Sequence, residues 1–393
     1  MSTPKLTPFF EPLRAMDRQF LAMEDANIHM HVSGFSVYEL EPLRSELGGV
    51  EFGVFRDAIA AALDRIPRYR QRLHSTPIEK IPVWVDAAEF DLDDHLYHLS
   101  LPLPGNAAQL KETVGWIVSQ PLDASRPLWE MWLVEGVGGG KYFAVVTKMH
   151  HCMVDGGSGV NLMQVLLSAK PERKIRAPKP FAPRPLPDAV DLIAFEISRR
   201  VGAPLRLFGG LRDFAATGPG LFANVRQRAG AFVELLENVL PASRTPISRA
   251  PLGPRRRVDC FESPLAEFTA LRRRLGCSLN DLVLAIIAGA VRRYLKRHDV
   301  ELEGLDFRVS IPVNVRLEAD SDEMGNRISS WIVSLPLAEP EPLKQLAAIE
   351  RCTAGQIDDV FEFPLGSRAH QSFGGRALQP LHQAQPKAQG GPA

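Results

Sequence analysis

Apolar residues recur with two different periods along the first 150 residues of the chain. In residues 12–25 and 53–66 they fall every three or four positions, which is the spacing of one helix face. Residues 30–40 alternate between apolar and polar, and residues 141–150, "KYFAVVTKMH", present one set of side chains to each face of a strand. This part of the chain is therefore predicted to mix helices with strands.

The second half of the chain repeats this mixture. Residues 278–297 are apolar on nearly all sides and predict a buried helix. Ser278 and Asp281 have the spacing of a capping box at its start. Two strands and a further helix are predicted at residues 307–316, 327–337 and 341–360.

Prolines mark the best domain boundary. Residues 171–187, "PERKIRAPKPFAPRPLP", exclude a regular helix and favour a stiff extended linker. Residues 188–214 then predict a helix rich in apolar residues and arginine, either a membrane-surface segment or a helix that packs on its own protein. The predicted divisions are an N-terminal domain at 1–170, a linker with amphipathic helices at 171–250, a C-terminal domain at 251–365 and a disordered tail at 366–393.

Composition narrows the class of protein. The chain has 393 residues, 45% of them hydrophobic, which is typical of a folded protein with two domains. Lys+Arg and Asp+Glu are both 46, so no net charge draws the chain to nucleic acid. The four cysteines are scattered and fit a reducing cytosol. Neither a signal peptide nor a run of about 20 apolar residues is present, so a cytoplasmic protein is expected.

Residues 147–160, "TKMHHCMVDGGSGV", place two histidines at the end of a predicted strand. Because side chains alternate along a strand, His150 and His151 are expected to point to opposite sides. Asp155 follows in the glycine-rich turn and can fold back to hold it. Imidazole has a pKa of about 6.5, so one histidine can accept a proton from a substrate hydroxyl, and no serine or cysteine nucleophile is then needed.

The preceding strand reaches the same place through a hairpin. Residues 136–141, "GVGGGK", predict its glycine-rich turn. If Gly136 pairs with Lys141, His150 lies opposite Pro127. The stretch "RPLW" is therefore expected beside the histidines.

Three alternatives to a catalytic base stay open at this point. The histidines can simply end the strand while the glycines make a turn. A metal site is disfavoured, because two adjacent histidines on one strand do not easily bind one ion and no further ligand motif follows. Cys152 as a nucleophile is disfavoured because nothing in the sequence suggests a lowered thiol pKa.

A resemblance adds to this reading. His150, His151, Asp155 and Gly156 spell HHxxxDG, the signature of the CoA-dependent acyltransferase superfamily. The rest of the chain resembles the bacterial wax ester synthase/diacylglycerol acyltransferase family. The similar stretches include "MDRQFLAMED", "FDLDDHLYHLSLPLPG", "QPLDASRPLWEMWLVEGV", "LGPRRRV", "LNDLVLAIIAGAVRRYL", "SIPVNVR" and "GNRISSWIVSLPL".

The resemblance assigns roles to the motif residues. It makes His151 the general base, His150 and Asp155 supports of the turn, and Gly156 the residue that leaves room for substrate. The family's PLW motif falls on Pro127, Leu128 and Trp129 as substrate-channel residues, although a strand tryptophan equally often packs in a core. Its ND motif falls on Asn280, a candidate oxyanion donor, and Asp281, for which helix capping is the simpler role. Arg255 to Arg257 are either CoA-phosphate ligands or a solvated loop.

The resemblance also implies a fold and a reaction. The fold is of the α/β class, an α+β sandwich with two domains like that of chloramphenicol acetyltransferase. The reaction transfers a fatty acyl group from acyl-CoA, which is a substrate and not a cofactor, to diacylglycerol or a long-chain alcohol. The implied location is cytoplasmic, with peripheral contact to the inner membrane or lipid inclusions. No cofactor, metal or nucleic acid is implied.

The sequence departs from the family pattern after about Phe361. No "NVPGP"-type strand is visible, so the second domain is expected to be incomplete at its C-terminus. An alternative hypothesis is therefore a truncated, non-catalytic relative that binds lipid or partners. Amide-forming condensation shares HHxxxDG but is disfavoured by the PLW and ND matches.

Overall fold

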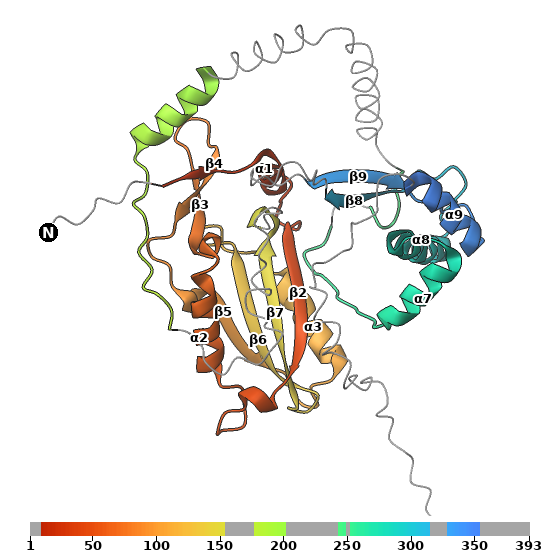
Figure 1. Ribbon diagram of the computed structural model, residues 1–393, viewed down its shortest axis with the longest axis horizontal. Helices are drawn as coiled ribbons and strands as arrows, with labels where there is room; N and C mark the ends of the chain where they lie inside the picture. Colours follow the sequence, from red (N-terminus) through yellow and green to blue (C-terminus); the bar gives the residue numbers. More distant parts are fainter. Residues whose placement is uncertain (1–8, 154–176, 202–242, 249–251, 315–327, 354–393) are drawn as a thin grey trace, which may run out of the picture.

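The computed structural model describes residues 9–153, 177–201, 243–248, 252–314 and 328–353 (Figure 1). Asp155, Gly156, residues 202–214 of the predicted amphipathic segment and the tail 366–393 lie outside the described residues. In Figure 1 the elements up to residue 153 form one lobe around a sheet, and those after residue 252 form a second lobe beside it.

A four-stranded sheet forms the centre of the first lobe. Its order is β2 (His31–Glu39), β7 (Tyr142–His150), β6 (Trp129–Val137) and β5 (Leu96–Ser100). β5 is parallel to β6, and the other neighbours are antiparallel. β7 has a partner on each side, and its residues from 143 to 150 are all buried. It is the central strand that the apolar run predicts.

Helices cover both faces of this sheet. α2 (Phe52–Leu63) packs on one face and α3 (Ala107–Ser119) on the other. Val145 of β7 belongs to the core under α2, and its neighbour Val146 belongs to the core under α3. Consecutive side chains of β7 therefore serve two separate cores, as the alternation of a strand requires.

A buried lysine joins β7 to α3. Lys148 is completely buried, and its Nζ lies 2.8 Å from a carboxylate oxygen of Glu130. The same nitrogen donates to the carbonyls of Ile117 at 3.3 Å and Gln120 at 3.1 Å, at the end of α3. All three ammonium donors thus have acceptors, which a buried charge requires.

The hairpin between β6 and β7 differs by one residue from the predicted register. Trp129 pairs with Met149, and the N–H of His150 donates to Leu128 at 2.9 Å, so Leu128 takes the place predicted for Pro127. The hairpin closes with Val137 opposite Tyr142, and the pairing shifts at a bulge between residues 134 and 137. The turn lies one residue further along the chain than predicted, which shifts the pairing by two residues, and the bulge then takes back one of them.

A smaller sheet lies next to the first one. It contains β1 (Glu11–Pro12), β4 (Pro82–Asp86) and β3 (Gln71–Ser75). Residues 177–188 of the proline-rich segment run past it as neither helix nor strand. Arg184 ties this segment to Asp86 at 2.8 Å.

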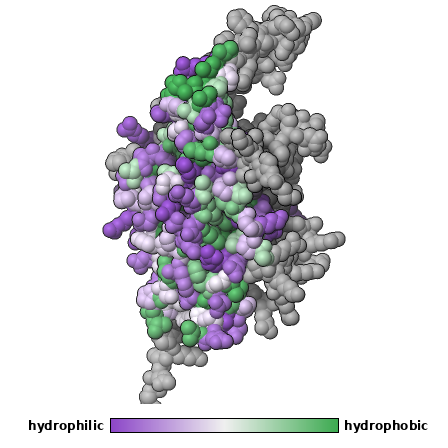
Figure 2. All heavy atoms as spheres, turned by 90° about the vertical axis from the view of Figure 1, so that its left-hand side faces the viewer, coloured by the Kyte–Doolittle hydropathy of each residue, from purple (hydrophilic) through white to green (hydrophobic). Residues whose placement is uncertain are grey.

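A helix at residues 189–201 then packs on the small sheet. Leu192 is buried there, and a carboxylate oxygen of Glu196 accepts from the N–H of Glu79 at 2.7 Å. On the other side Val190 and Ile197 are 72% and 54% exposed. Figure 2 shows hydrophobic side chains gathered at the upper end of this side of the molecule. The helix packs on its own protein with one face and leaves an apolar face open.

The second lobe combines helices with a two-stranded sheet. Its elements are α7 (Leu265–Leu275), α8 (Leu279–Arg297), β8 (Arg308–Asn314), β9 (Ile328–Ser334) and α9 (Pro342–Thr353). β8 and β9 pair antiparallel. Four of these five elements fall within the ranges predicted from the sequence, and α7 was not predicted.

α8 begins as predicted but is not buried all round. Ser278 and Asp281 form a capping box, which confirms the predicted start. Ile286 and Ile287 are each 43% exposed, because the core of this lobe lies on one side of the helix only. Within the described residues, no single helix is long and apolar enough to cross a membrane. α7 and α8 taken together meet the criterion of length and composition, but they are bent by 100°.

Candidate active site

The two histidines of the motif lie where β7 passes into the short turn η4 (His151–Met153). Helix α1 (Ala15–Ala22) contacts this turn. The N–H of His151 donates to the carbonyl of Met30 at 2.7 Å, just before β2. The turn is therefore held by the central strand, by α1 and by the start of β2.

His150 is buried and fixed. Its side chain is 2% exposed, and its Nδ1 accepts from the N–H of Cys152 at 3.0 Å, which assigns the ring proton to Nε2. That Nε2 lies 3.2 Å from Oε1 of Glu24, with angles that do not make a hydrogen bond. Burial lowers the pKa of His150, against the opposing effect of Glu24. A neutral ring that closes the turn fits a positioning role.

His151 has a different environment. Its ring stacks on Phe20 of α1, with 3.9 Å between the ring centroids and 28° between the planes. It is only partly buried, but its Nδ1 is buried and has no hydrogen-bond partner among the described residues. An imidazole held by stacking, with a ring nitrogen that has no partner among the described residues, is suited to act as a general base.

Two more histidines line up beside this pair, and the sequence reading did not single them out. His31 on β2 lies directly opposite His150, with 6.4 Å between their ring centroids. His29 stacks against His31 at 5.3 Å. Burial lowers the pKa of His31 to about 3, helped by the positive charge of Lys148. The signal was the "HMH" spacing at the start of a predicted strand, but only the pairing of β2 with β7 brings it to the motif.

The PLW residues support the histidines from β6. The carbonyl of Leu128 accepts the N–H of His150 at 2.9 Å. Trp129 is 1% exposed, its indole N–H donates to the carbonyl of Tyr69 at 2.8 Å, and its ring stacks on His95 at 4.6 Å. Pro127 is buried as well. This placement favours the packing role of Trp129, and contact with substrate stays a prediction.

The ND residues lie in the second lobe at the start of α8. Asp281 accepts from Ser278 in the capping box and from the hydroxyl of Thr353 at 2.5 Å, so it also joins α8 to α9. Asn280 is buried, and its Oδ1 has no partner among the described residues. Within those residues no hydrogen bond or ring contact joins Asn280 to either histidine. Its role as an oxyanion donor stays a prediction.

The remaining alternatives can be compared with the same geometry. Cys152 is buried, and burial raises the pKa of its thiol, which disfavours a nucleophilic thiolate. No group of three metal-ligating side chains is found in the described parts of the chain. Asp155 and Gly156 cannot be compared, because they lie outside those parts.

Comparison with known proteins decides the family. Residues 13–283 match the wax ester synthase/diacylglycerol acyltransferase catalytic domain. The chain belongs to this family. The matched range contains the motif histidines, the PLW residues and the ND residues, and it ends within α8.

Curated members of the family agree with this assignment. A Mycobacterium tuberculosis protein with the provisional name diacylglycerol O-acyltransferase is 30% identical over 341 residues, 86% of this chain and 65% of its own length. A second protein of that organism with the same kind of name is also 30% identical, over 85% of this chain and 68% of its own length. This chain spans about two thirds of the length of these relatives.

Solved structures give the fold. The wax ester synthase/diacylglycerol acyltransferase of Marinobacter aquaeolei matches with a TM-score of 0.54 and 24% identity, over 87% of this chain and 71% of that one. The first condensation domain of the calcium-dependent antibiotic synthetase matches with a TM-score of 0.50 and 15% identity, over 88% and 74%. The predicted mixed α/β fold, with two lobes of the chloramphenicol acetyltransferase kind, is confirmed.

Proposed function

We propose that this family member is an O-acyltransferase that moves a fatty acyl group from acyl-CoA to the hydroxyl of diacylglycerol or a long-chain alcohol. The observation that carries the proposal is the pair of histidines at the end of β7. One is buried, neutral and bonded within the turn, and the other keeps a ring nitrogen without a partner among the described residues. Family membership supplies the reaction class.

In the proposed mechanism His151 takes the proton of the acceptor hydroxyl. The acceptor oxygen attacks the thioester carbonyl, and a tetrahedral oxyanion forms. The carbon–sulfur bond then breaks, and the CoA sulfur leaves as a thiol with the proton returned by His151. A positioned base of this kind contributes about 10²- to 10⁴-fold. No covalent enzyme intermediate is needed, and acyl-CoA enters as a substrate, so no separate cofactor takes part.

The neighbours of His151 have supporting roles in this proposal. His150 closes the turn through Cys152, and Leu128 holds His150 through its backbone. Asp155 and Gly156 lie outside the described residues, and their predicted roles, to hold the turn and to leave room for substrate, are kept in the proposal. Asn280 is the proposed donor to the oxyanion, which requires the second lobe to face the first during the reaction.

The direct test is an assay of the purified chain with radiolabelled palmitoyl-CoA and either dioleoylglycerol or hexadecanol. His151→Ala is expected to lower the rate by about 10²-fold or more, because it removes the base. His95→Gln is a matched control, since His95 is a buried histidine that bonds to the backbone of Trp129. Full activity of His151→Ala would refute the mechanism. Binding of lipid without turnover by the unchanged chain would instead favour the non-catalytic alternative.

Contact with a membrane or a lipid-inclusion surface is part of the same proposal, because both acceptors are lipids. Helix 189–201 supports it with the exposed side chains of Val190, Ile197 and Val201. Ile197→Asp is expected to lower co-flotation of the protein with phosphatidylcholine liposomes, because a charged side chain on the apolar face opposes its insertion into the lipid. Ser198→Asp, which changes a polar residue on the same helix, is the control. Equal flotation of the two variants would contradict this part of the proposal.

A further inference from the structure

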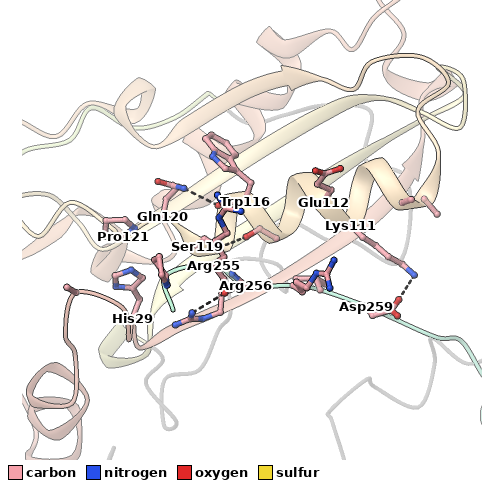
Figure 3. Close-up of a pocket in the computed structure, with 17 residues that line it drawn as sticks. His29, Lys111, Glu112, Trp116, Ser119, Gln120, Pro121, Arg255, Arg256 and Asp259 are labelled. Carbon is pink, nitrogen blue, oxygen red and sulfur yellow. Dashed lines mark hydrogen bonds and ion pairs between the residues drawn. The ribbon is translucent and has the colours of Figure 1, made fainter. Parts of the chain in front are cut away.

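A pocket of about 1230 Å³ opens on the first lobe (Figure 3). One wall is helix α3. The other is the segment 254–259, which precedes α7 in the chain and lies against α3. In Figure 3 His29 lies at one end of the pocket, and the ion pair between Lys111 and Asp259 lies at the other.

The middle arginine of the run 255–257 fixes this wall. The backbone N–H of Arg256 donates to the hydroxyl of Ser119 at 2.7 Å, and its guanidinium donates to the carbonyls of Asn27 and Gly253. A side chain at Gly115 would place its first carbon 2.8 Å from the carbonyl oxygen of Arg256. The segment therefore lies directly against α3, at a distance that only glycine permits.

The two flanking arginines are left available by this arrangement. Arg255 and Arg257 are both exposed, and neither has an ion-pair partner among the described residues. Lys111 at the far end already has Asp259 at 2.5 Å. A pair of unpartnered guanidinium groups at the edge of a pocket is suited to phosphate oxygens, which they bind with paired N–H donors.

An aromatic face completes the pocket. Trp116 belongs to α3 and is 52% exposed, and its ring packs against Trp132 in a T-shaped arrangement with 5.5 Å between the centroids. An indole that is half exposed and held by a neighbouring ring can stack on a purine base. Trp116 and Gln120 line the pocket together with Arg255.

The pocket also points toward the candidate base. His29 at its end stacks on His31 at 5.3 Å, and the ring of His31 lies 6.4 Å from that of His150. A long ligand with its charged end in the pocket would therefore extend along this row toward His150, the neighbour of the candidate base. Acyl-CoA has this form, with a phosphorylated adenosine at one end and the thioester at the other.

We infer that this pocket binds the adenosine 3′-phosphate 5′-diphosphate end of acyl-CoA, with the base on Trp116 and the phosphates on Arg255 and Arg257. The inference rests on the proposed function for the identity of the ligand. The phosphate of a phospholipid headgroup has the same charge chemistry, but it has no flat base to place on Trp116. That difference allows the two sources to be separated.

The first experiment measures binding of adenosine 3′,5′-bisphosphate to the full chain by isothermal titration calorimetry. The double variant Arg255→Ala/Arg257→Ala is expected to bind about 10-fold or more weakly, because charge-assisted hydrogen bonds are lost. Arg273→Ala/Arg274→Ala is the matched control from a second arginine run, on α7, and is expected to bind within twofold of the unchanged chain. Equal affinity of both double variants would overturn the inference.

The second experiment separates the nucleotide from a lipid headgroup. Trp116→Leu is expected to lower the affinity for adenosine 3′,5′-bisphosphate by about 10-fold. Trp116→Phe is expected to keep most of this affinity, because phenylalanine retains an aromatic face for stacking. Binding to phosphatidylglycerol vesicles is measured for the same variants. Loss of vesicle binding together with unchanged nucleotide binding in the Arg255/Arg257 variant would overturn the inference in favour of a phospholipid.

The third experiment distinguishes this inference from the proposed function. His151→Ala is expected to bind the nucleotide as the unchanged chain does while losing turnover. In the assay the Arg255/Arg257 variant is expected to raise KM for palmitoyl-CoA about 10-fold with little change in kcat. If the Arg255/Arg257 variant turned over substrate with an unchanged KM, the inferred nucleotide site would be refuted while the proposed acyltransferase function stood. If nucleotide binding depended on these arginines but the unchanged chain showed no turnover, the proposed function would be refuted while the nucleotide site stood.

Discussion

The two lobes hold their candidate catalytic residues in different ways. In the first lobe β7 is buried on both faces, so His150 and His151 emerge from a strand that α2 and α3 enclose. In the second lobe Asn280 begins a helix that buries one side only. The base is thus fixed by long-range packing, whereas the proposed oxyanion donor is fixed mainly by a local cap. Substitutions in the packed core should therefore disturb the candidate base in the first lobe. Substitutions in the helix cap should disturb the proposed oxyanion donor in the second lobe.

The largest effect is expected from Trp129→Ala, which removes a buried ring and its hydrogen bond to Tyr69. We expect a loss of about 3–5 kcal/mol in the free energy of unfolding. Ile349→Ala is the counterpart in the second lobe, where that side chain is fully buried. Hydrogen exchange of β7 and of α8, followed by mass spectrometry, tests the contrast. If each variant raised exchange equally in both lobes, the lobes would be one cooperative unit.

Asn280→Ala comes next and tests the role of the second lobe in the reaction. We expect kcat to fall by about 10²- to 10³-fold if the amide donates to the oxyanion. Leu279→Ala, one position earlier on the same helix, is the control. If kcat fell in both variants in proportion to the fall in their melting temperatures, Asn280 would contribute to activity only through the stability of the fold.

A smaller effect is expected from the cap itself. Ser278→Ala removes the hydroxyl that donates to the carboxylate of Asp281 and accepts from the backbone N–H of Asp281. We expect a loss of about 0.5–2 kcal/mol in urea unfolding. Ser278→Asn, which can still cap, should recover most of it. If Ser278→Ala left the free energy of unfolding in urea unchanged, the hydrogen bond from Thr353 would be sufficient to hold Asp281.

The smallest effect concerns pH. Burial lowers the pKa of His31 to about 3, so between the unfolded pKa of about 6.5 and this value the unfolded chain binds a proton that the folded chain does not. Stability should therefore be complete above that unfolded pKa and fall as the pH is lowered through this window. His31→Gln should flatten the fall, whereas His298→Gln, an exposed histidine in the second lobe, should not. Urea midpoints at pH 7 and pH 5 measure the difference.

Local chemistry accounts for what could be predicted from the sequence. The capping residues of α8 interact within one turn of the helix, and the run of apolar residues in β7 predicts directly that this strand is buried. The hairpin register was wrong by one residue, because glycines at positive φ and a bulge leave no mark in the apolar pattern. His31 was missed for another reason: it reaches His150 only through pairing of strands that lie far apart in the chain. Such pairings depend on the whole sheet.

Lys148 gives the two sites of the first lobe a mechanical link. It stands two residues before His150 on the same face of β7, and it holds the last carbonyls of α3, next to the pocket residues Ser119 and Gln120. A ligand that shifts the end of α3 must therefore pull on the strand that carries the motif. The nucleotide end of a ligand in the pocket would then act on the catalytic turn through one ammonium group, in addition to any contact that the thioester end makes there.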